Sequence, residues 1–229
     1  MRVRVLGVDG YRAGWVAVEL AGGSFVQARA APTLVQLLAA APDAAAVGVD
    51  MPLGLLDHGW RQADVEAAGL IGARRSSVFR VPPRPVWTEF GLHEYAAANL
   101  RCRELTGTGF SRQAWALRAK LLEADSCLAA GGHPLYEVHP ELSFRTMAGA
   151  PLRYAKRTWN GQMSRRALLS GEGIALPDDI GAAGRVPPED VLDAAAAAWS
   201  AHRIATGTAR SVPDPPQRHP SGQPIAIWY

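Results

Sequence analysis

Apolar and polar positions in the first third of the chain predict a small antiparallel sheet followed by a helix and a further strand. Residues 3–9 and 14–20 are apolar runs joined by a Gly-rich turn, and "SFVQARA" at 24–30 alternates as an antiparallel strand does. "PTLVQLLAAAP" has the proline start and apolar spacing of a short helix, and "AAAVGVD" is typical of a buried strand ending in Asp50. The predicted order is therefore strand, strand, strand, helix, strand.

The rest of the chain predicts an insertion, one more strand and a long helix. Residues 51 to about 133 mix turns, the Pro-rich "RVPPRPVW" and helical pieces such as 112–130, which is typical of an insertion. "PLYEVHPE" predicts a short strand and 188–206 a long helix, while about 211–229 is a Pro-rich tail whose last residues, "IAIWY", indicate a closing strand or an ordered end. We predict a single α/β domain over 1–229, in which helices flank a mixed central sheet of a three-stranded antiparallel meander plus parallel strands.

Aspartates stand where the two buried strands end. Asp9 closes the first strand, and Asp50 closes the next long apolar strand. If those strands are parallel neighbours, both side chains emerge at the carboxyl edge of the sheet, where open α/β sheets bind ligands. The long helix offers Asp190 and Asp193, which are three residues apart and therefore share a face. We expect the four aspartates to converge on one acidic site.

A structural explanation competes for each of these residues. Aspartate in "GVDG" is a common turn former, and acidic residues after Pro187 and Pro188 favour the helix dipole without any catalysis. Asp193 is harder to explain in this way, because it precedes the apolar run "AAAAAW", where an unpaired carboxylate is costly to bury. Mg²⁺ or Mn²⁺ would supply the missing partner.

The segment "EVHPE" adds Glu137, His139 and Glu141, which share one face if the chain stays extended to Pro140. His139 is equally compatible with a structural position at a strand end. In the functional interpretation Glu137 is a direct or indirect metal ligand, and His139 carries a proton near a scissile phosphate.

Composition limits the class of protein that the chain can be, and the charged residues are unevenly distributed along the chain. The two cysteines form no zinc motif, and no run approaches the roughly 18 apolar residues of a membrane span, so we expect a cytoplasmic protein that does not bind membranes. The net charge is +3, yet residues 61–120 hold 10 basic and 5 acidic side chains. This excess is either a solvated surface or a footprint for phosphates.

Two groups of residues are the candidate phosphate contacts. "GARRSSVF" pairs two guanidinium groups with two hydroxyl groups, and "KRTWNGQMSRR" carries four further cations. The candidates are Arg74, Arg75, Ser76, Ser77, Lys156, Arg157, Arg165 and Arg166.

The motifs "LGVDG", "VGVDMP", "EVHPE" and "PPEDVLDAAAAAW" resemble, in this order, a poorly characterised bacterial and archaeal family of predicted RNase H-like nucleases. The resemblance runs from residue 5 to about 207 and includes "ARRSSVF", "GFSRQAW" and "KRTWNGQMSRRALL". It departs at Glu189, where the family often has aspartate.

The carboxylate layout is also similar to that of Holliday-junction resolvases, in which an aspartate on strand one, an acidic residue on the fourth strand and a pair on the final helix hold metal. The resemblance implies an RNase H-like fold and phosphodiester hydrolysis with two Mg²⁺ or Mn²⁺ ions about 4 Å apart. Asp9, Asp50, Asp190 and Asp193 would be the ligands. DNA or RNA is the implied substrate, and a homodimer is compatible with the resemblance because resolvases that cut symmetric substrates act as dimers.

Two other functions remain open at this stage. A non-catalytic nucleic-acid-binding module could use the same scaffold. Sugar kinases and actin-like ATPases share the RNase H-like core and also begin with a glycine-flanked aspartate, although those proteins use two such domains.

Overall fold

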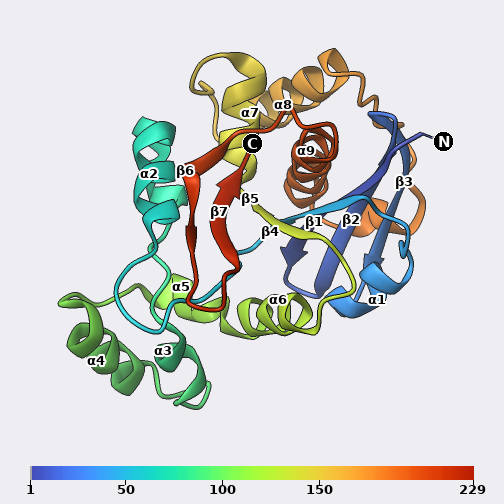
Figure 1. The fold of residues 1–229 in the computed structure, drawn as a ribbon. Helices are drawn as coiled ribbons and strands as arrows, with labels where there is room; N and C mark the ends of the chain where they lie inside the picture. Colours follow the sequence, from blue (N-terminus) through green and yellow to red (C-terminus); the bar gives the residue numbers. More distant parts are fainter. Residues whose placement is uncertain (1) are drawn as a thin grey trace. The chain divides into compact units, whose positions relative to one another are not determined.

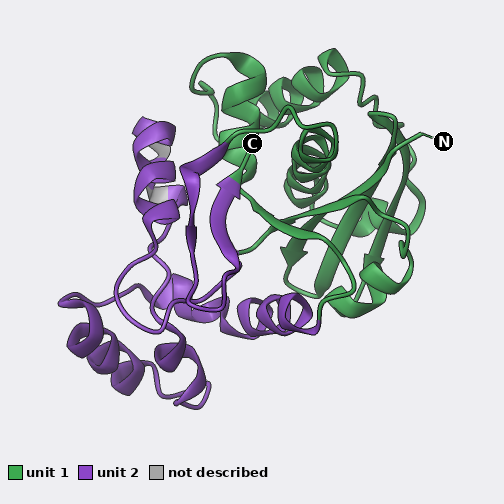
Figure 2. Cartoon of the chain, in the orientation of Figure 1, with its two compact units in different colours: residues 1–51, 131–210, 228–229 green, residues 52–130, 211–227 purple. Residues whose placement is uncertain are grey.

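The computed structural model describes residues 2–229, apart from the side chains of residues 73, 74 and 76. The chain divides into two compact units (Figure 2). The first unit comprises Met1–Met51, Gly131–Arg210 and Trp228–Tyr229, and the second comprises Pro52–Ala130 and Ser211–Ile227. The assignment of the whole chain to one domain stays a prediction.

A mixed sheet forms the centre of the fold, as the sequence predicts. Within the first unit the strands follow the order β3-β2-β1-β4-β5. In the first unit, β1 pairs antiparallel with β2 and β2 with β3, whereas β4 lies parallel to β1 and β5 parallel to β4. The antiparallel meander and the two parallel strands of the prediction are therefore confirmed. The bounds of these five strands are Arg4–Tyr11 (β1), Gly14–Ala21 (β2), Ser24–Ala31 (β3), Ala46–Asp50 (β4) and Leu135–Val138 (β5).

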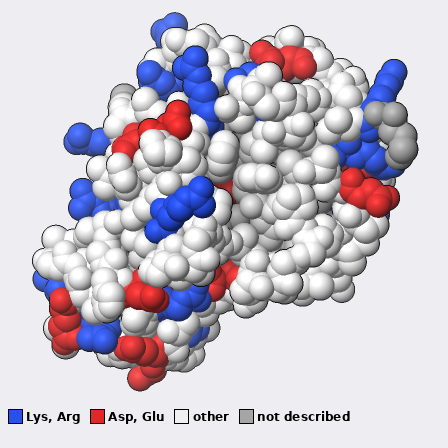
Figure 3. All heavy atoms as spheres, viewed as in Figure 1, with Lys and Arg blue, Asp and Glu red and all other residues white. Residues whose placement is uncertain are grey.

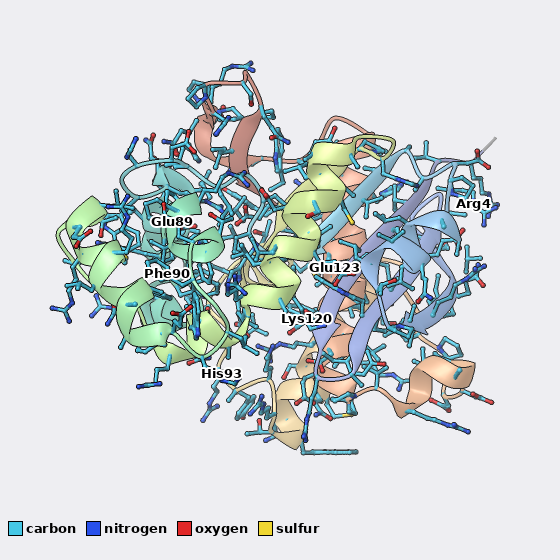
Figure 4. The ribbon with its side chains drawn as sticks, turned by 90° about the horizontal axis from the view of Figure 1, so that it is seen from below. Arg4, Glu89, Phe90, His93, Lys120 and Glu123 are labelled. Carbon is cyan, nitrogen blue, oxygen red and sulfur yellow. The ribbon has the colours of Figure 1, made fainter. Side chains whose placement is uncertain are left out.

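Helices cover both faces of this sheet. The long helix α9 packs on β1, β2 and β4, and α7 and α8 pack against α9. The short helix α1 contacts β2 and β3 from the opposite side (Figures 1 and 4). The bounds of the helices of the first unit are Leu34–Ala39 (α1), Pro140–Ala148 (α7), Trp159–Gly171 (α8), Gly181–Arg185 (the 3₁₀ helix η2) and Pro188–Ala205 (α9).

The backbone of α9 lies directly against the backbone of the sheet at two glycines. A Cβ atom added to Gly7 would lie 1.9 Å from the Ala198 nitrogen and 2.2 Å from the Ala194 oxygen. A Cβ atom on Gly48 would lie 2.5 Å from the Ala197 oxygen. Residues Ala194 to Ala198 are fully buried. Glycines on the strands and alanines on the helix thus allow α9 to approach the sheet more closely than larger side chains would.

One buried carboxylate of the sheet has a structural explanation. Glu19 on β2 accepts hydrogen bonds from Arg4 Nε at 2.8 Å and from Gln27 Nε2 at 2.6 Å. Arg4, labelled in Figure 4, begins β1 and is half exposed. Because Glu19 is ion-paired and hydrogen-bonded, it needs no further ligand.

The second unit is built from short helices and a C-terminal hairpin. Its hydrophobic centre includes the stacked rings of Trp87 and Trp115, against which Phe110 and Tyr95 pack. The bounds are Gln62–Ile71 (α2), Gly72–Ser77 (the 3₁₀ helix η1), Arg84–Thr88 (α3), Tyr95–Thr106 (α4), Arg112–Ala116 (α5), Arg118–Ala130 (α6), Ser211–Arg218 (β6) and Pro224–Trp228 (β7, whose last residue belongs to the first unit).

Two segments differ from the sequence expectation. The predicted helical piece at 112–130 is interrupted at Leu117. The Leu117 amide donates a hydrogen bond to the Ala114 oxygen, three residues back instead of the four of an α-helix, so α5 ends before α6 begins. The Pro-rich stretch after residue 210 forms strand β6, which has β7 as its one neighbouring strand. An edge strand tolerates proline because one of its sides needs no amide donors. Of the two alternatives for "IAIWY", the closing strand is the one observed.

Some basic residues of the second unit form ion pairs with nearby acids. Arg84 donates two hydrogen bonds to Asp125, and Arg101 lies within ion-pair distance of Glu89 and Glu104. On the face shown in Figure 3, lysine and arginine side chains are interspersed with acidic ones. The excess of positive charge along residues 61–120 therefore does not gather into one basic field on that face.

The close approach of α9 yields a test of the fold. Replacement of Gly7 by alanine forces the new methyl group against the backbone of α9, so we expect Gly7→Ala to lower the free energy of unfolding by about 3 kcal/mol or more. Gly69→Ala on α2 is the matched control, because its added Cβ meets nothing within 4 Å and alanine favours helix. Urea titration of both variants measures the difference, and equal stability of the two would contradict this packing.

Candidate metal centre at the sheet edge

The first two aspartates lie side by side at the ends of neighbouring strands. Asp9 and Asp50 are register partners in the parallel pair formed by β1 and β4. Side chains of register partners point to the same face of a sheet, and strand alternation places these two on the face of Gly7 and Gly48, which α9 covers. The expectation that parallel strands bring both carboxylates to one edge is confirmed.

The third aspartate comes from α9. Asp193 immediately precedes the buried alanines, and it is itself buried. One carboxylate oxygen from each of Asp9, Asp50 and Asp193 lies within 4.8 Å of the other two. Three segments that are distant in sequence thus form one acidic triad that could hold a metal ion.

Burial and mutual repulsion disfavour the ionised form of these carboxyl groups. Burial raises the pKa of Asp9 well above its ordinary value, and the charges of Asp50 and Asp193 raise it further. Burial likewise raises the pKa of Asp50 to about 7, with Asp193 adding to the effect. The pKa of Asp193 is also raised by burial, although Lys156 opposes the shift. Ionisation of all three carboxyl groups at once is therefore disfavoured unless a further cation binds.

The side chain of Lys156 contacts the triad directly. Its Nζ atom donates a hydrogen bond of 2.5 Å to Asp193 Oδ2. Burial alone would lower the pKa of Lys156, but Asp193, with Asp50 and Asp9 beyond it, raises the pKa above its usual value. Lys156 therefore stays protonated and offsets part of the charge of the triad.

Asp190 lies beside the triad but outside it. It is half-buried in the first turn of α9, and burial raises its pKa to about 6. The neighbouring Glu189 lies 3.4 Å from the Nε atom of Arg157. Asp190 contributes negative charge to the site, whereas its place among metal ligands stays a prediction.

The segment "EVHPE" does not remain extended as far as Glu141. Strand β5 ends at Val138, His139 is the N-cap residue of α7, and Glu141 lies in the first turn of that helix. Glu141 instead forms an ion pair with Arg165. The face predicted to be shared by these residues is therefore interrupted by the helix start.

Glu137 and His139 are not members of the acidic triad. Glu137 is the register partner of Val49, so strand alternation directs it to the sheet face opposite to Asp50. Catalytic roles for Glu137 and His139 stay predictions.

The predicted phosphate-contact residues near α8 differ in their surroundings. Arg165 is fully buried and donates to Glu141 and to the Gly161 oxygen, while Arg166 donates to Asp178 and to the Leu176 oxygen. Arg157 is exposed. Arg165 therefore supports the fold of this segment. The sequence analysis did not predict the ion pair between Arg165 and Glu141 or the hydrogen bond from Lys156 to Asp193.

The other predicted phosphate contacts belong to the second unit. Residues 74–77 lie in η1, where Arg75 and Ser77 are exposed. The side chains of Arg74 and Ser76 lie outside the described part of the structure.

Among the described residues, no helix is both long and apolar enough to cross a membrane.

The raised pKa values predict how stability depends on pH. An unfolded aspartate ionises near pH 4, whereas Asp50 holds its proton to about pH 7 and Asp190 to about pH 6. The folded protein then binds more protons than the unfolded chain between these limits, so the free energy of unfolding falls as pH rises from about 4 to about 7.

We expect Asp50→Asn to reduce this fall, because asparagine has no proton to lose. A difference of one in pKa between the folded and unfolded states corresponds to roughly 1.4 kcal/mol of stability. Urea titrations at pH 5 and pH 8 measure the effect, and Asp43→Asn, at an exposed position, is the control. A pH dependence in Asp50→Asn as steep as that of the unmodified protein would show that the acidic triad does not govern it.

Comparison with known proteins places this chain in a family and offers no characterised relative. No curated protein and no solved structure matches it significantly. The family model described as "Protein of unknown function (DUF429)" matches residues 7–218, a span that includes all three aspartates of the triad and Lys156. The chain therefore belongs to the DUF429 family.

Proposed function

We propose that this protein is a metal-dependent nuclease with an RNase H-like catalytic layout. The observation that carries the proposal is the acidic triad, in which Asp9, Asp50 and Asp193 approach within 4.8 Å of one another. Three buried carboxylates at such a distance are electrostatically costly, and a divalent cation is the partner that would offset the cost.

The topology around the triad supports the RNase H-like interpretation. An antiparallel meander, a helix and a parallel strand follow one another in the chain, and the strands β3-β2-β1-β4-β5 are neighbours in that order. The aspartates stand on the first strand, the fourth strand and the last helix, which is similar to the carboxylate layout of Holliday-junction resolvases.

The residues of the triad suit Mg²⁺ or Mn²⁺. Both ions prefer oxygen ligands, and Mg²⁺ is commonly held by one or two carboxylates together with water and phosphate oxygens. Asp9 accepts a hydrogen bond of 2.6 Å from the Gly10 amide, which fixes one of its oxygens. A bound divalent ion would supply an activated water and stabilise the leaving oxygen during phosphodiester hydrolysis.

The residues around the triad would position the substrate backbone. Lys156 places a fixed positive charge at Asp193, and Arg157 lies next to it in the chain. Both side chains could attract a phosphate group toward an otherwise negative site. Independently of these two side chains, the sequence motifs offer Arg166 and, in the second unit, Arg74, Arg75, Ser76 and Ser77 as candidates for phosphate contacts.

The first test concerns metal binding and cleavage. We expect Asp9→Asn and Asp193→Asn to weaken Mn²⁺ binding, measured by isothermal titration calorimetry, by at least about tenfold, because each removes one of three carboxylates. We expect the unmodified protein to cleave at least one member of a panel of single-stranded, duplex and branched DNA and RNA with Mg²⁺ or Mn²⁺. Asp43→Asn is the control for both measurements.

Mn²⁺ binding that is unchanged in both triad variants would refute the proposed metal site. Metal binding without cleavage of any substrate would favour the non-catalytic binding module instead.

The second test concerns Lys156. In Lys156→Met the carboxylate of Asp193 loses its positively charged partner, so the metal-free protein should become less stable. Mn²⁺ should bind about tenfold more tightly, because a competing cation has been removed. Lys120→Met is the matched control, because Lys120 is the chain's other lysine and lies on α6 (Figure 4). Unchanged or weaker Mn²⁺ binding in Lys156→Met would contradict the competition.

A further inference from the structure

The chain from Gly149 to Gly171 has an unusual surface composition. It contains no acidic residue and five basic residues, of which Arg165 is buried. Its aromatic side chains are exposed rather than buried, since Trp159 is 73% and Tyr154 37% accessible to solvent. Tryptophan is normally among the highly buried side chains. A largely exposed tryptophan within a purely basic segment is therefore a candidate binding feature.

The backbone holds this segment in a defined conformation. A Cβ atom on Gly161 would lie 1.8 Å from the Ala155 oxygen, so the loop folds tightly over the first turn of α8. Thr158 caps that helix by accepting a hydrogen bond of 3.1 Å from the Gly161 amide. The buried Arg165 donates to the oxygens of Tyr154 and Gly161 from beneath. Trp159 is thus presented to solvent from a fixed position.

The apolar surface extends along α8 and has cations beside it. Met163 is 38% exposed, and it lies four residues after Trp159, so the two side chains share a helix face. The guanidinium of Arg153 lies 5.3 Å from the centre of the Tyr154 ring, and Arg157 is 82% exposed. Aromatic rings next to guanidinium groups match the two parts of a nucleotide, its base and its phosphate.

The segment is tied to the acidic triad by Lys156, which bonds Asp193. Trp159 follows Lys156 by three positions, which sets the distance between their Cα atoms at about 11 Å at most. A base on Trp159 would therefore belong to a nucleotide within a few positions of a phosphate at the triad.

We infer that residues 153–163 are a platform for unpaired nucleotides, in which a base stacks on Trp159 while Arg153 and Arg157 contact the backbone. Stacking on an exposed ring requires a base whose face is free, which a strand outside a duplex offers and a continuous duplex does not. The substrate class is then single-stranded nucleic acid, or a duplex with an unpaired strand. This inference rests on the proposed nuclease function and specifies its substrate.

The test compares the binding of labelled oligonucleotides by fluorescence anisotropy in EDTA, so that no metal-dependent cleavage occurs. A single-stranded oligonucleotide of about 20 nucleotides, its duplex and a strand of the same length lacking bases are the probes. We expect Trp159→Ala to weaken binding of the single strand by about tenfold or more, to leave the duplex and the abasic strand unchanged, and Trp159→Phe to restore most of the loss. Leu100→Ala, which removes another exposed apolar side chain, is the control.

Three results would overturn the inference. These are an unchanged affinity for the single strand, an equal loss on all three probes, and a shift of oligomeric state in Trp159→Ala by sedimentation, which would make the surface an interface between copies of the chain. The outcome is separable from that of the nuclease proposal. Unchanged Mn²⁺ binding in the triad variants would refute the metal site and would leave the oligonucleotide result standing. If the triad variants lose cleavage but Trp159→Ala binds the single strand as the unmodified protein does, only the platform is refuted.

Discussion

The close contact between α9 and the strands β1 and β4 is the constraint on which the site depends. Gly7 and Gly48 leave room for the helix backbone, and the alanines from Ala194 onward present no bulk of their own. Asp193 directly precedes those alanines, so the depth at which the helix packs also sets the distance from Asp193 to Asp9 and Asp50. A larger residue at either glycine would displace the helix and the third carboxylate together.

The acidic triad shows how the fold bears an electrostatic cost at its site. Glu19 illustrates the ordinary solution, in which a buried carboxylate is neutralised by an arginine and a glutamine. At the sheet edge burial raises the pKa values of all three aspartates, repulsion within the triad raises those of Asp9 and Asp50 further, and Lys156 opposes only part of the rise. Clusters of carboxyl groups with raised pKa values are typical of functional sites, because stability alone would not favour them.

The segment from Arg153 to Met163 connects the site to the surface. Lys156 and Arg157 interact with the first two turns of α9, and the buried pair of Arg165 and Glu141 supports the loop from within. Tyr154 and Trp159, in contrast, are presented to solvent. One segment therefore combines neutralisation of the triad with an exposed aromatic surface, which is the physical basis for linking the two in function.

Whereas the parallel pairing of β1 with β4 was decided by the tertiary structure, sequence alone determined the three strands of the meander, the buried strands that end in Asp9 and Asp50, and the long helix that carries Asp193. These follow from local patterns, because apolar runs, turn residues and proline starts act over a few positions along the chain. Tertiary structure decided the features that depend on contacts between distant residues. The break at Leu117, the burial of Arg165 and the bond from Lys156 to Asp193 leave no periodic signal in the sequence. The role of Lys156 had one trace, its rarity as one of two lysines, but a side chain that spans to a carboxylate 37 positions away is specified only by the packing of the folded chain.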